Sequence, residues 1–337
     1  METLSSSISR NTNTNTNTLV KNEPVMLVDT SYWLYHRFFA LRNWYHRAYP
    51  DKVNEPGFNN ADYDWFNDEI FITKYKKLFI ENLKKITKKF KITMKNVVFC
   101  IDCSHKDIWR LNHPQGLGLN TTVFAEYKGT RQESHKKNEF NSFNIFRYIK
   151  TDFLVKEQVE HGYKILQHAK SEADDIIGLL APYLVRNGWG KVYILASDND
   201  YLQICCDNIT LLDGSGKILN KAEKQGEKYL ISKILLGDVS DNIKCCLVNC
   251  GFLENGFVNT KYKAAYKSYM ERLLNDKDKY EMLRQILYYN RGVEILSSSQ
   301  VCFNIVINFK ENQILMDFQM IPNDIKLELE ILFNQLI

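Results

Sequence analysis

Five short acidic motifs are spread along the chain, and their residue types suit the binding of divalent metal ions. They are VMLVD ending at Asp29, VVFCID ending at Asp102, SEADD at 171–175, ASDND at 196–200 and GDVSDN at 237–242. Most of these carboxylates follow an apolar run, as they would at the carboxyl end of a buried parallel strand or the start of the next helix. Carboxylates gathered at one edge repel each other unless cations lie among them. Such oxygen ligands suit Mg²⁺ or Mn²⁺, and two of these ions roughly 3.5–4 Å apart can cleave phosphodiesters, so the motifs predict a metal-dependent nuclease.

The spacing within the motifs lets neighbouring acids share one site. Asp198 and Asp200 are two residues apart at an expected strand end, and Asp238 and Asp241 have the three-residue spacing of a helix or tight turn. SEADD places its acids in the first turn of a helix that Ser171 would cap. Any one pair alone is as well explained by capping, whereas five groups at corresponding ends indicate a common metal site. The candidate ligands are Asp29, Asp102, Glu172, Asp174, Asp175, Asp198, Asp200, Asp238 and Asp241.

The elements that must position these acids alternate between strands and helices. Apolar and β-branched runs predict strands at 25–29, 96–102, 162–167, 191–197 and 208–212. A long amphipathic helix is expected from about 65 to 90, and a loop over 43–62. Alternation of this kind predicts an α/β fold with a mostly parallel sheet.

The chain divides into three segments by composition. Residues 1–22, with their Asn-Thr repeats, are expected to form a disordered tail. Residues 23–235 hold most of the motifs and predict the nuclease domain, and the helical pattern of 236–337 predicts a C-terminal subdomain. No run of about 18 or more apolar residues occurs, and the N-terminus lacks the apolar core of a signal peptide, so we expect an intracellular protein that does not span a membrane.

Positive charge is concentrated in two stretches although the net charge is only +4. Residues 74–95 hold nine lysines against the single acid Glu81, and residues 127–150 hold six basic against two acidic side chains. A basic surface beside an acidic pocket suits a polyanion that is held by lysines while metal ions act on it. For the lysines on the expected helix from about 65 to 90, the sequence favours a solvated helix face over direct contact with DNA.

The eight cysteines raise the possibility of a zinc site. Cys100 and Cys103 form a CxxC pair, but Asp102 lies between them at the end of an apolar strand. Disulfides are not expected in an intracellular protein, so the sequence favours free thiols.

Longer stretches around the acids are similar to a known family. VDTSYWLY, FCIDCS, FAEYKGTR, SEADDIIGLLA, LASDNDYLQI and LLGDVSDNI occur in the family's order over residues 25–242. The chain thus resembles the 5′-nuclease superfamily, which includes flap endonucleases, polymerase-type 5′–3′ exonucleases and the phage RNase H-type enzymes. NQILMDFQMIP at 312–322 also looks like the closing segment of phage-type members. The resemblance implies a PIN-like sheet, a helical arch at about 105–150 and a divergent, helix-hairpin-helix-like C-terminal region.

The resemblance also implies how two metal ions would be shared. The first ion would be held mainly by Asp29, Asp102, Glu172 and Asp174, and the second would be held mainly by Asp198, Asp200 and Asp241. Asp175 and Asp238 would assist or lie in an outer shell. The ions would lower the pKa of a bound water and neutralise charge on the leaving oxygen.

Contacts with nucleic acid are implied by position in the same motifs. Tyr127, Lys128 and Arg131 in YKGTR resemble the base of the arch, where Lys128 and Arg131 would act on the scissile phosphate. Tyr35 falls where the family stacks a ring on a base, although a core role is an equal alternative. Further candidate arch cations are Lys136, Lys137, Arg147 and Lys150.

The chain departs from the family after GDVSDN. The family usually continues into a glycine-rich GIGxKTA hairpin that grips duplex phosphates with a bound potassium ion. Here only Gly251 and Gly256 remain, without the spacing of that motif. Potassium binding and the usual duplex footprint are therefore in doubt, although Lys261, Lys263 and Lys267 could still contact phosphates.

Together these features predict a monomeric, structure-specific 5′–3′ exonuclease or flap endonuclease with two Mg²⁺ or Mn²⁺ ions. Its substrate would be DNA with a 5′ flap, nick or free 5′ end, with RNA primers and RNA/DNA hybrids as further candidates, at sites of DNA replication. The alternatives are a PIN-type endonuclease of single-stranded RNA and a non-catalytic nucleic-acid-binding protein. The sequence leaves open the exo/endo balance, the polymerase or clamp partner, and the choice between nucleus and cytoplasm.

Overall fold

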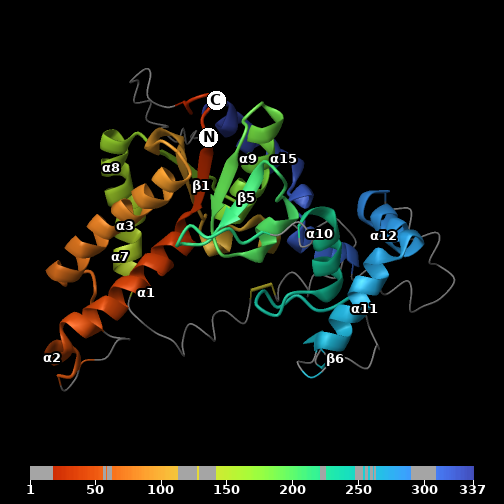
Figure 1. The fold of residues 1–337 in the computed structure, drawn as a ribbon, viewed down its shortest axis with the longest axis horizontal. Helices are drawn as coiled ribbons and strands as arrows, with labels where there is room; N and C mark the ends of the chain where they lie inside the picture. Colours follow the sequence, from red (N-terminus) through yellow and green to blue (C-terminus); the bar gives the residue numbers. More distant parts are fainter. Residues whose placement is uncertain are drawn as a thin grey trace, which may run out of the picture.

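A five-stranded parallel sheet lies at the centre of the molecule, with the strand order β3-β2-β1-β4-β5 (Figure 1). Its strands are β1 (Val25–Asp29), β2 (Val97–Ile101), β3 (Lys164–Gln167), β4 (Val192–Leu195) and β5 (Ile209–Leu212). The computed structural model describes residues 18–55, 58, 63–112, 127–128, 142–220, 225–246, 253–254, 257–258, 261, 263–289 and 309–337. The expected α/β class with a mostly parallel sheet is confirmed.

The register of the sheet brings the carboxyl ends of its central strands level. Val28 of β1 pairs with Phe99 of β2 on one side and with Leu195 of β4 on the other. Residues 25–28 are completely buried, because helices cover both faces of the sheet. The residues that follow β1, β2 and β4 therefore emerge at the same edge.

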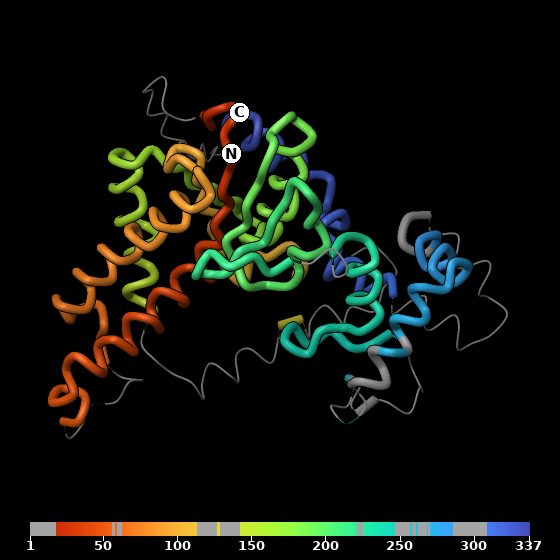
Figure 2. The backbone as a smooth tube through the Cα atoms, viewed as in Figure 1, coloured from red at the N-terminus to blue at the C-terminus, as the bar shows by residue number. Residues whose placement is uncertain are grey.

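An aromatic layer of helices covers one face. Its helices are α1 (Thr30–Ala48), α3 (Glu69–Lys89), α7 (Phe143–Tyr148) and α8 (Leu154–His161), with a π-helical turn (Ile149–Phe153) between the last two. The Phe79 ring on α3 lies 6.0 Å from the Trp33 ring on α1 and 6.1 Å from the Phe99 ring on β2. Tyr75 donates a hydrogen bond of 2.8 Å to the Leu34 carbonyl, which further joins α3 to α1. Figure 2 shows these two helices running side by side away from the sheet.

Helix α1 runs further than the sequence predicts. Instead of a loop over 43–62, α1 continues to Ala48 and the short α2 (Pro50–Val53) follows. The reason is packing, because the buried Tyr45 ring contacts those of Trp65 at 5.6 Å and Phe71 at 5.9 Å. Tertiary contacts of this kind override the local preference of asparagine and proline for loops.

Helix α9 (Ala173–Arg186) and the C-terminal segment cover the other face. Residues 309–316 are helical, and a short turn (Phe318–Met320) and α15 (Asn323–Asn334) follow. The Phe318 ring packs on Gly178 of α9 so closely that a Cβ there would lie 2.4 Å from it. Residues 309–337 thus complete the core of the sheet rather than a separate subdomain, in contrast to the expectation for 236–337.

The two ends of the described chain meet beside this face (Figure 1). The amide of Leu19 donates to the Leu336 carbonyl at 2.6 Å, and Leu19 is buried. Asn96 exchanges two hydrogen bonds with Val20, at 2.7 and 2.9 Å. Residues 18–22, expected to belong to a tail, are therefore fixed to the domain.

The remaining helices lie on the side of the sheet away from α1 and α3 (Figure 2). They are α10 (Gly226–Leu236), α11 (Lys263–Asn275) and α12 (Lys277–Tyr289), with the small β6 (Leu253–Glu254) and β7 (Phe257–Val258) hairpin. Short helices also occur at Met94–Asn96, His105–Asp107, Trp109–Asn112 (α4) and Asn199–Gln203 (η4). No helix among the described residues is long and apolar enough to span a membrane.

Candidate metal centre

Two aspartates mark the ends of the central strands. Asp29 ends β1 and caps α1, where its Oδ1 accepts a hydrogen bond of 2.9 Å from the Tyr32 amide. Asp102 follows β2, and its Oδ1 accepts a 2.8 Å bond from the Ala173 amide at the start of α9. Ser31 donates to the other Asp102 oxygen. These bonds fix both carboxylates where β1, β2 and α9 converge.

The acids of SEADD form a first carboxylate group at the start of α9. Ligand atoms of Glu172, Asp174 and Asp175 all lie within 4.8 Å of one another. The helix begins one residue later than predicted, with Glu172 rather than Ser171 as the N-cap residue, because the Ser171 hydroxyl is bonded to His168 at 2.8 Å. Asp174 Oδ1 is buried and accepts no hydrogen bond from any residue that the structure describes. A buried carboxylate oxygen of this kind fits a metal ligand.

Arg110 of α4 forms ion pairs with two acids of this first group. Its Nη2 atom lies 2.7 Å from Asp175, its Nη1 atom lies 3.3 Å from Glu172, and its Nε atom donates to the Leu315 carbonyl at 2.9 Å. Asp175 also accepts bonds from the Trp109 indole at 3.0 Å and the Glu172 amide at 3.1 Å. The oxygens of Asp175 are thus engaged by protein groups, which suits a residue that positions ligands.

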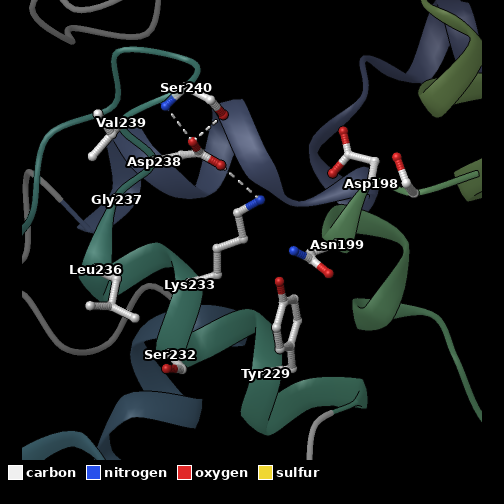
Figure 3. A pocket seen from close by; sticks show the side chains of 11 residues that line it. Asp198, Asn199, Tyr229, Ser232, Lys233, Leu236, Gly237, Asp238, Val239 and Ser240 are labelled. Carbon is white, nitrogen blue, oxygen red and sulfur yellow. Dashed lines mark hydrogen bonds and ion pairs between the residues drawn. The ribbon is translucent and has the colours of Figure 1, made fainter. Parts of the chain in front are cut away.

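A second carboxylate group lies after β4 and α10. Asp198 Oδ1 accepts a 2.9 Å bond from the Asp200 amide. The ammonium of Lys233 on α10 contacts Asp200. It also lies 3.1 Å from Asp238 (Figure 3). Asp238 in turn accepts bonds from the Ser240 amide at 2.7 Å and hydroxyl at 2.5 Å.

Glycine is required where the GDVSDN loop leaves α10. Gly237 has φ +70°, and a Cβ there would lie 2.3 Å from the Ile243 carbonyl oxygen. The Asp238 and Ile243 amides each donate to the other residue's carbonyl at 2.7 Å, which closes the loop. This closure holds Asp238 and Asp241 toward the site.

Lys128 joins the two groups. Its amide donates to the Asp241 carbonyl at 2.9 Å, and its ammonium lies 2.6 Å from Glu172. Tyr127 donates a longer bond of 3.5 Å to Glu172, and its ring lies 4.9 Å from the Lys128 ammonium. Lys128 is buried with φ +56°, so this turn is held in a conformation that few side chains adopt.

Of the other predicted contact residues, Tyr35 lies near Asp102, whose charge adds to burial in raising the pKa of the Tyr35 hydroxyl, and several lie outside the described residues. Tyr35 is 37% exposed, and its ring packs edge-on against Phe146 at 4.7 Å. Lys261 is exposed, and Lys263 begins α11. Outside the described residues are Arg131, Lys136 and Lys137.

Burial and mutual repulsion raise the pKa values of several carboxyls. Burial, followed by the charges of Asp102, Asp174 and Asp198, raises the pKa of Asp29 to about 8. Burial and Asp174 raise the pKa of Glu172 to about 7 although Lys128 and Arg110 oppose this. Asp198 is exposed, but desolvation of its carboxyl by the surrounding protein raises its pKa to about 6, with Lys233 opposing and Asp174 and Asp241 adding to the effect. These interactions connect both groups in one electrostatic site that favours bound cations.

The raised pKa values predict a pH-dependent stability in the absence of metal. Between about pH 4 and pH 8 the folded protein holds more protons on Asp29 and Glu172 than the unfolded chain, so the free energy of unfolding should fall as pH rises. Denaturant unfolding in EDTA at about pH 5.5, 7 and 8.5 measures this slope. Asp29→Asn should make the slope shallower, and an equal or steeper slope in that variant would contradict the prediction.

Sequence reasoning missed the cations and hydroxyls that support the acids. Lys233 and Arg110 belong to no acidic motif, and the Tyr201 hydroxyl, which donates to Asp29 at 3.3 Å, lies one residue beyond ASDND. The only sequence signal for Arg110 is a basic residue within the apolar stretch IWRL. A charge buried among apolar residues requires a charged partner.

The chain is similar to known proteins over most of its length. Residues 24–233 match the family model described as 5′-3′ exonuclease, N-terminal resolvase-like domain. A 5′-3′ exonuclease of Buchnera aphidicola subsp. Schizaphis graminum is 29% identical over 252 residues, covering 72% of this chain and 73% of the relative. A ribonuclease H of Enterobacteria phage T4 is 24% identical over 263 residues, covering 77% and 76%.

Solved structures share the fold at low sequence identity. A T5 5′-exonuclease with bound zinc ions superposes with a TM-score of 0.52 at 14% identity, covering 93% of this chain and 99% of that one. A T5 D15 flap endonuclease in a complex with DNA and metal ions gives a TM-score of 0.52 at 13% identity, covering 93% and 98%. Because the family model spans most of the chain, from β1 into α10, the protein belongs to the 5′-3′ exonuclease family with an N-terminal resolvase-like domain.

Proposed function

We propose that the chain is a structure-specific 5′ nuclease that hydrolyses phosphodiesters near 5′ ends or junctions of DNA with two Mg²⁺ or Mn²⁺ ions. The observation that carries this proposal is the convergence of acids from separate segments on one edge of the sheet, where burial and the charges of Asp102, Asp174 and Asp198 all raise the pKa of Asp29. The buried Asp174 Oδ1 accepts no hydrogen bond from the residues that the structure describes, which leaves it for a ligand. Family membership supports the nuclease chemistry, and the flap endonuclease among the structural neighbours supports a substrate with a 5′ flap.

The proposed ligands divide as the two carboxylate groups do. The first ion would be held mainly by Asp29, Asp102, Glu172 and Asp174. The second would be held mainly by Asp198, Asp200 and Asp241, and Asp175 and Asp238 would have supporting roles. When bound, the ions would lower the pKa of a water molecule and neutralise charge on the leaving oxygen. Carboxylate oxygens fit hard divalent ions, and the metal-ligand cluster found among the described residues at the start of α9 contains only carboxylates.

The protein's own groups would orient the substrate. The Lys128 ammonium lies among the first carboxylates, where it can also contact a bound phosphate and stabilise charge in the transition state. Tyr35 is exposed enough to stack on a base beside the cut. We further propose that the protein acts as a monomer inside the cell, at sites of DNA replication.

A panel of substrates tests this function against its alternatives. A 5′-flap duplex, a DNA hairpin and a single-stranded RNA are each incubated with the protein in Mg²⁺, in Mn²⁺ or in EDTA. We expect flap cutting that requires the metal and far exceeds RNA cutting. Cutting of RNA alone would favour a PIN-type ribonuclease, and binding without cutting would favour a non-catalytic protein.

A further inference from the structure

Lys233 occupies the second carboxylate group in the way a bound cation would. It projects from the end of α10 toward Asp200 and Asp238, as Figure 3 shows for the Asp238 contact. The side chains of all three residues are largely buried, with exposed fractions of 12%, 15% and 21%. An ion pair shielded from solvent to this degree is screened little by salt.

The charge of Lys233 also acts on the rest of the group. Its attraction opposes the effect of desolvation on the pKa of Asp198. At Asp238 burial raises the pKa, but Lys233 and the hydrogen bonds from Ser240 together lower it below its usual value. One ammonium therefore attracts three of the carboxylates that are proposed to hold or support the second ion. A divalent cation on Asp200 and this ammonium would repel each other at contact distance.

The lysine has space into which to move. A cavity of about 570 Å³ adjoins the second group and is lined by Lys233 itself and by Asn199, Tyr229, Ser232, Asp238 and Ser240 (Figure 3). The lysine stem is flexible, and the hydroxyls in this cavity can accept hydrogen bonds from a displaced ammonium. Displacement would therefore not leave the charge without partners.

We propose that Lys233 is an internal counter-ion that competes with the second divalent ion for Asp200 and Asp238. This inference rests on the proposed two-metal function. Lys233 stabilises the ion-free site and lowers the affinity of the site for the second ion. The affinity for the first ion is unaffected, because Lys233 does not contact the group that would bind it. The second ion consequently binds more weakly than the first.

Binding of Mn²⁺ to the full chain without nucleic acid tests the proposal. Calorimetry and Mn²⁺ paramagnetic resonance compare the wild-type protein with Lys233→Met. The second ion should bind roughly 10- to 100-fold more tightly to the variant, the change that corresponds to one charge-assisted hydrogen bond. Affinity for the first ion should stay within about twofold. Thermal unfolding in EDTA should occur at a lower temperature in the variant, and Mn²⁺ should raise that temperature more than in the wild type.

Matched variants separate the charge from other effects. Lys228→Met removes an exposed lysine of the same helix, whose ammonium lies over the Tyr280 ring at 5.2 Å, and should change neither affinity. Lys233→Arg keeps the charge, so its affinity for the second ion should stay as low as in the wild-type protein. Lys233→Gln is a second neutral variant, which should behave as Lys233→Met does.

The outcomes distinguish this inference from the function beneath it. If the wild-type protein binds no Mn²⁺, the two-metal function itself fails and the inference fails with it. If the wild-type protein binds two ions and both neutral variants bind them with unchanged affinity, the function stands and the competition by Lys233 is overturned.

Discussion

Asp200→Asn should abolish cleavage of a 5′-flap duplex while leaving the binding of that duplex largely intact. Asp200 lies in the second carboxylate group beside Asp198 and contacts Lys233. The amide keeps the shape of the carboxylate but removes the charge that a divalent ion needs. Because even supporting residues of metal sites change activity by about 10- to 100-fold, loss of a ligand should lower the rate by at least about 100-fold. Single-turnover cleavage in Mg²⁺ and fluorescence anisotropy in EDTA measure the two effects.

An acidic cluster outside the proposed metal centre provides the control for Asp200→Asn. Glu157, Glu160 and His161 of α8 also have ligand atoms within 4.8 Å of one another, but they lie on the helical layer away from the strand ends. Glu160→Gln removes the same charge from an exposed side chain and should leave the cleavage rate within about twofold. Wild-type turnover by Asp200→Asn, or an equal loss in both variants, would argue against the proposed metal centre.

The location of the acids at one edge of the sheet can be predicted from the sequence, because it depends on the apolar runs that directly precede them. Asp29 and Asp102 come directly at or after apolar strands, and parallel strands end at one edge. The register of β1 with its neighbours then makes their meeting a consequence of the topology. Helix boundaries are less secure, as α9 shows, since the bond from Ser171 to His168 moves the N-cap to Glu172.

The partners of the acids could not be predicted in this way. Arg110 reaches Glu172 and Asp175 only because α4 packs near the start of α9 and the carbonyl of Leu315 receives its third bond. Lys233 depends similarly on how α10 docks against η4. The contacts of Arg110 and the contact of Lys233 with Asp200 join residues 33 to 205 positions apart, where no short-range periodicity carries information.

The C-terminal segment shows the same limit for domain organisation. Its resemblance to the closing segment of phage-type members does not predict where the segment lies in the fold. In the structure the carbonyls of Leu315 and Met316 accept bonds from Arg110 at 2.9 Å and Gln203 at 2.9 Å. One short stretch thus supports α4 behind the first carboxylate group and η4 behind the second, which explains why it belongs to the core of the sheet.

Arg110→Met should destabilise the fold more than any change at an exposed cation. Arg110 is 2% exposed, and its removal would leave Asp175, which is completely buried, without its ion pair. Breaking a buried ion pair from one side costs about 3–5 kcal/mol, since the remaining charge has lost its partner. Denaturant unfolding in EDTA measures this change in the free energy of unfolding. The cost should be smaller near pH 5 than near pH 8, because protonation neutralises the acid that is left behind.

Two further variants decide whether the ion pair is the cause. Arg147→Met removes an exposed arginine whose guanidinium lies 5.6 Å from the Phe143 ring, and should cost less than about 0.5 kcal/mol. Adding Asp175→Asn to Arg110→Met removes the unpaired charge and should recover part of the lost stability, because methionine and asparagine leave no buried ion. A double variant that is as unstable as the sum of both single changes would mean that Arg110 acts through packing, and its place as the electrostatic support of the first carboxylate group would have to be abandoned.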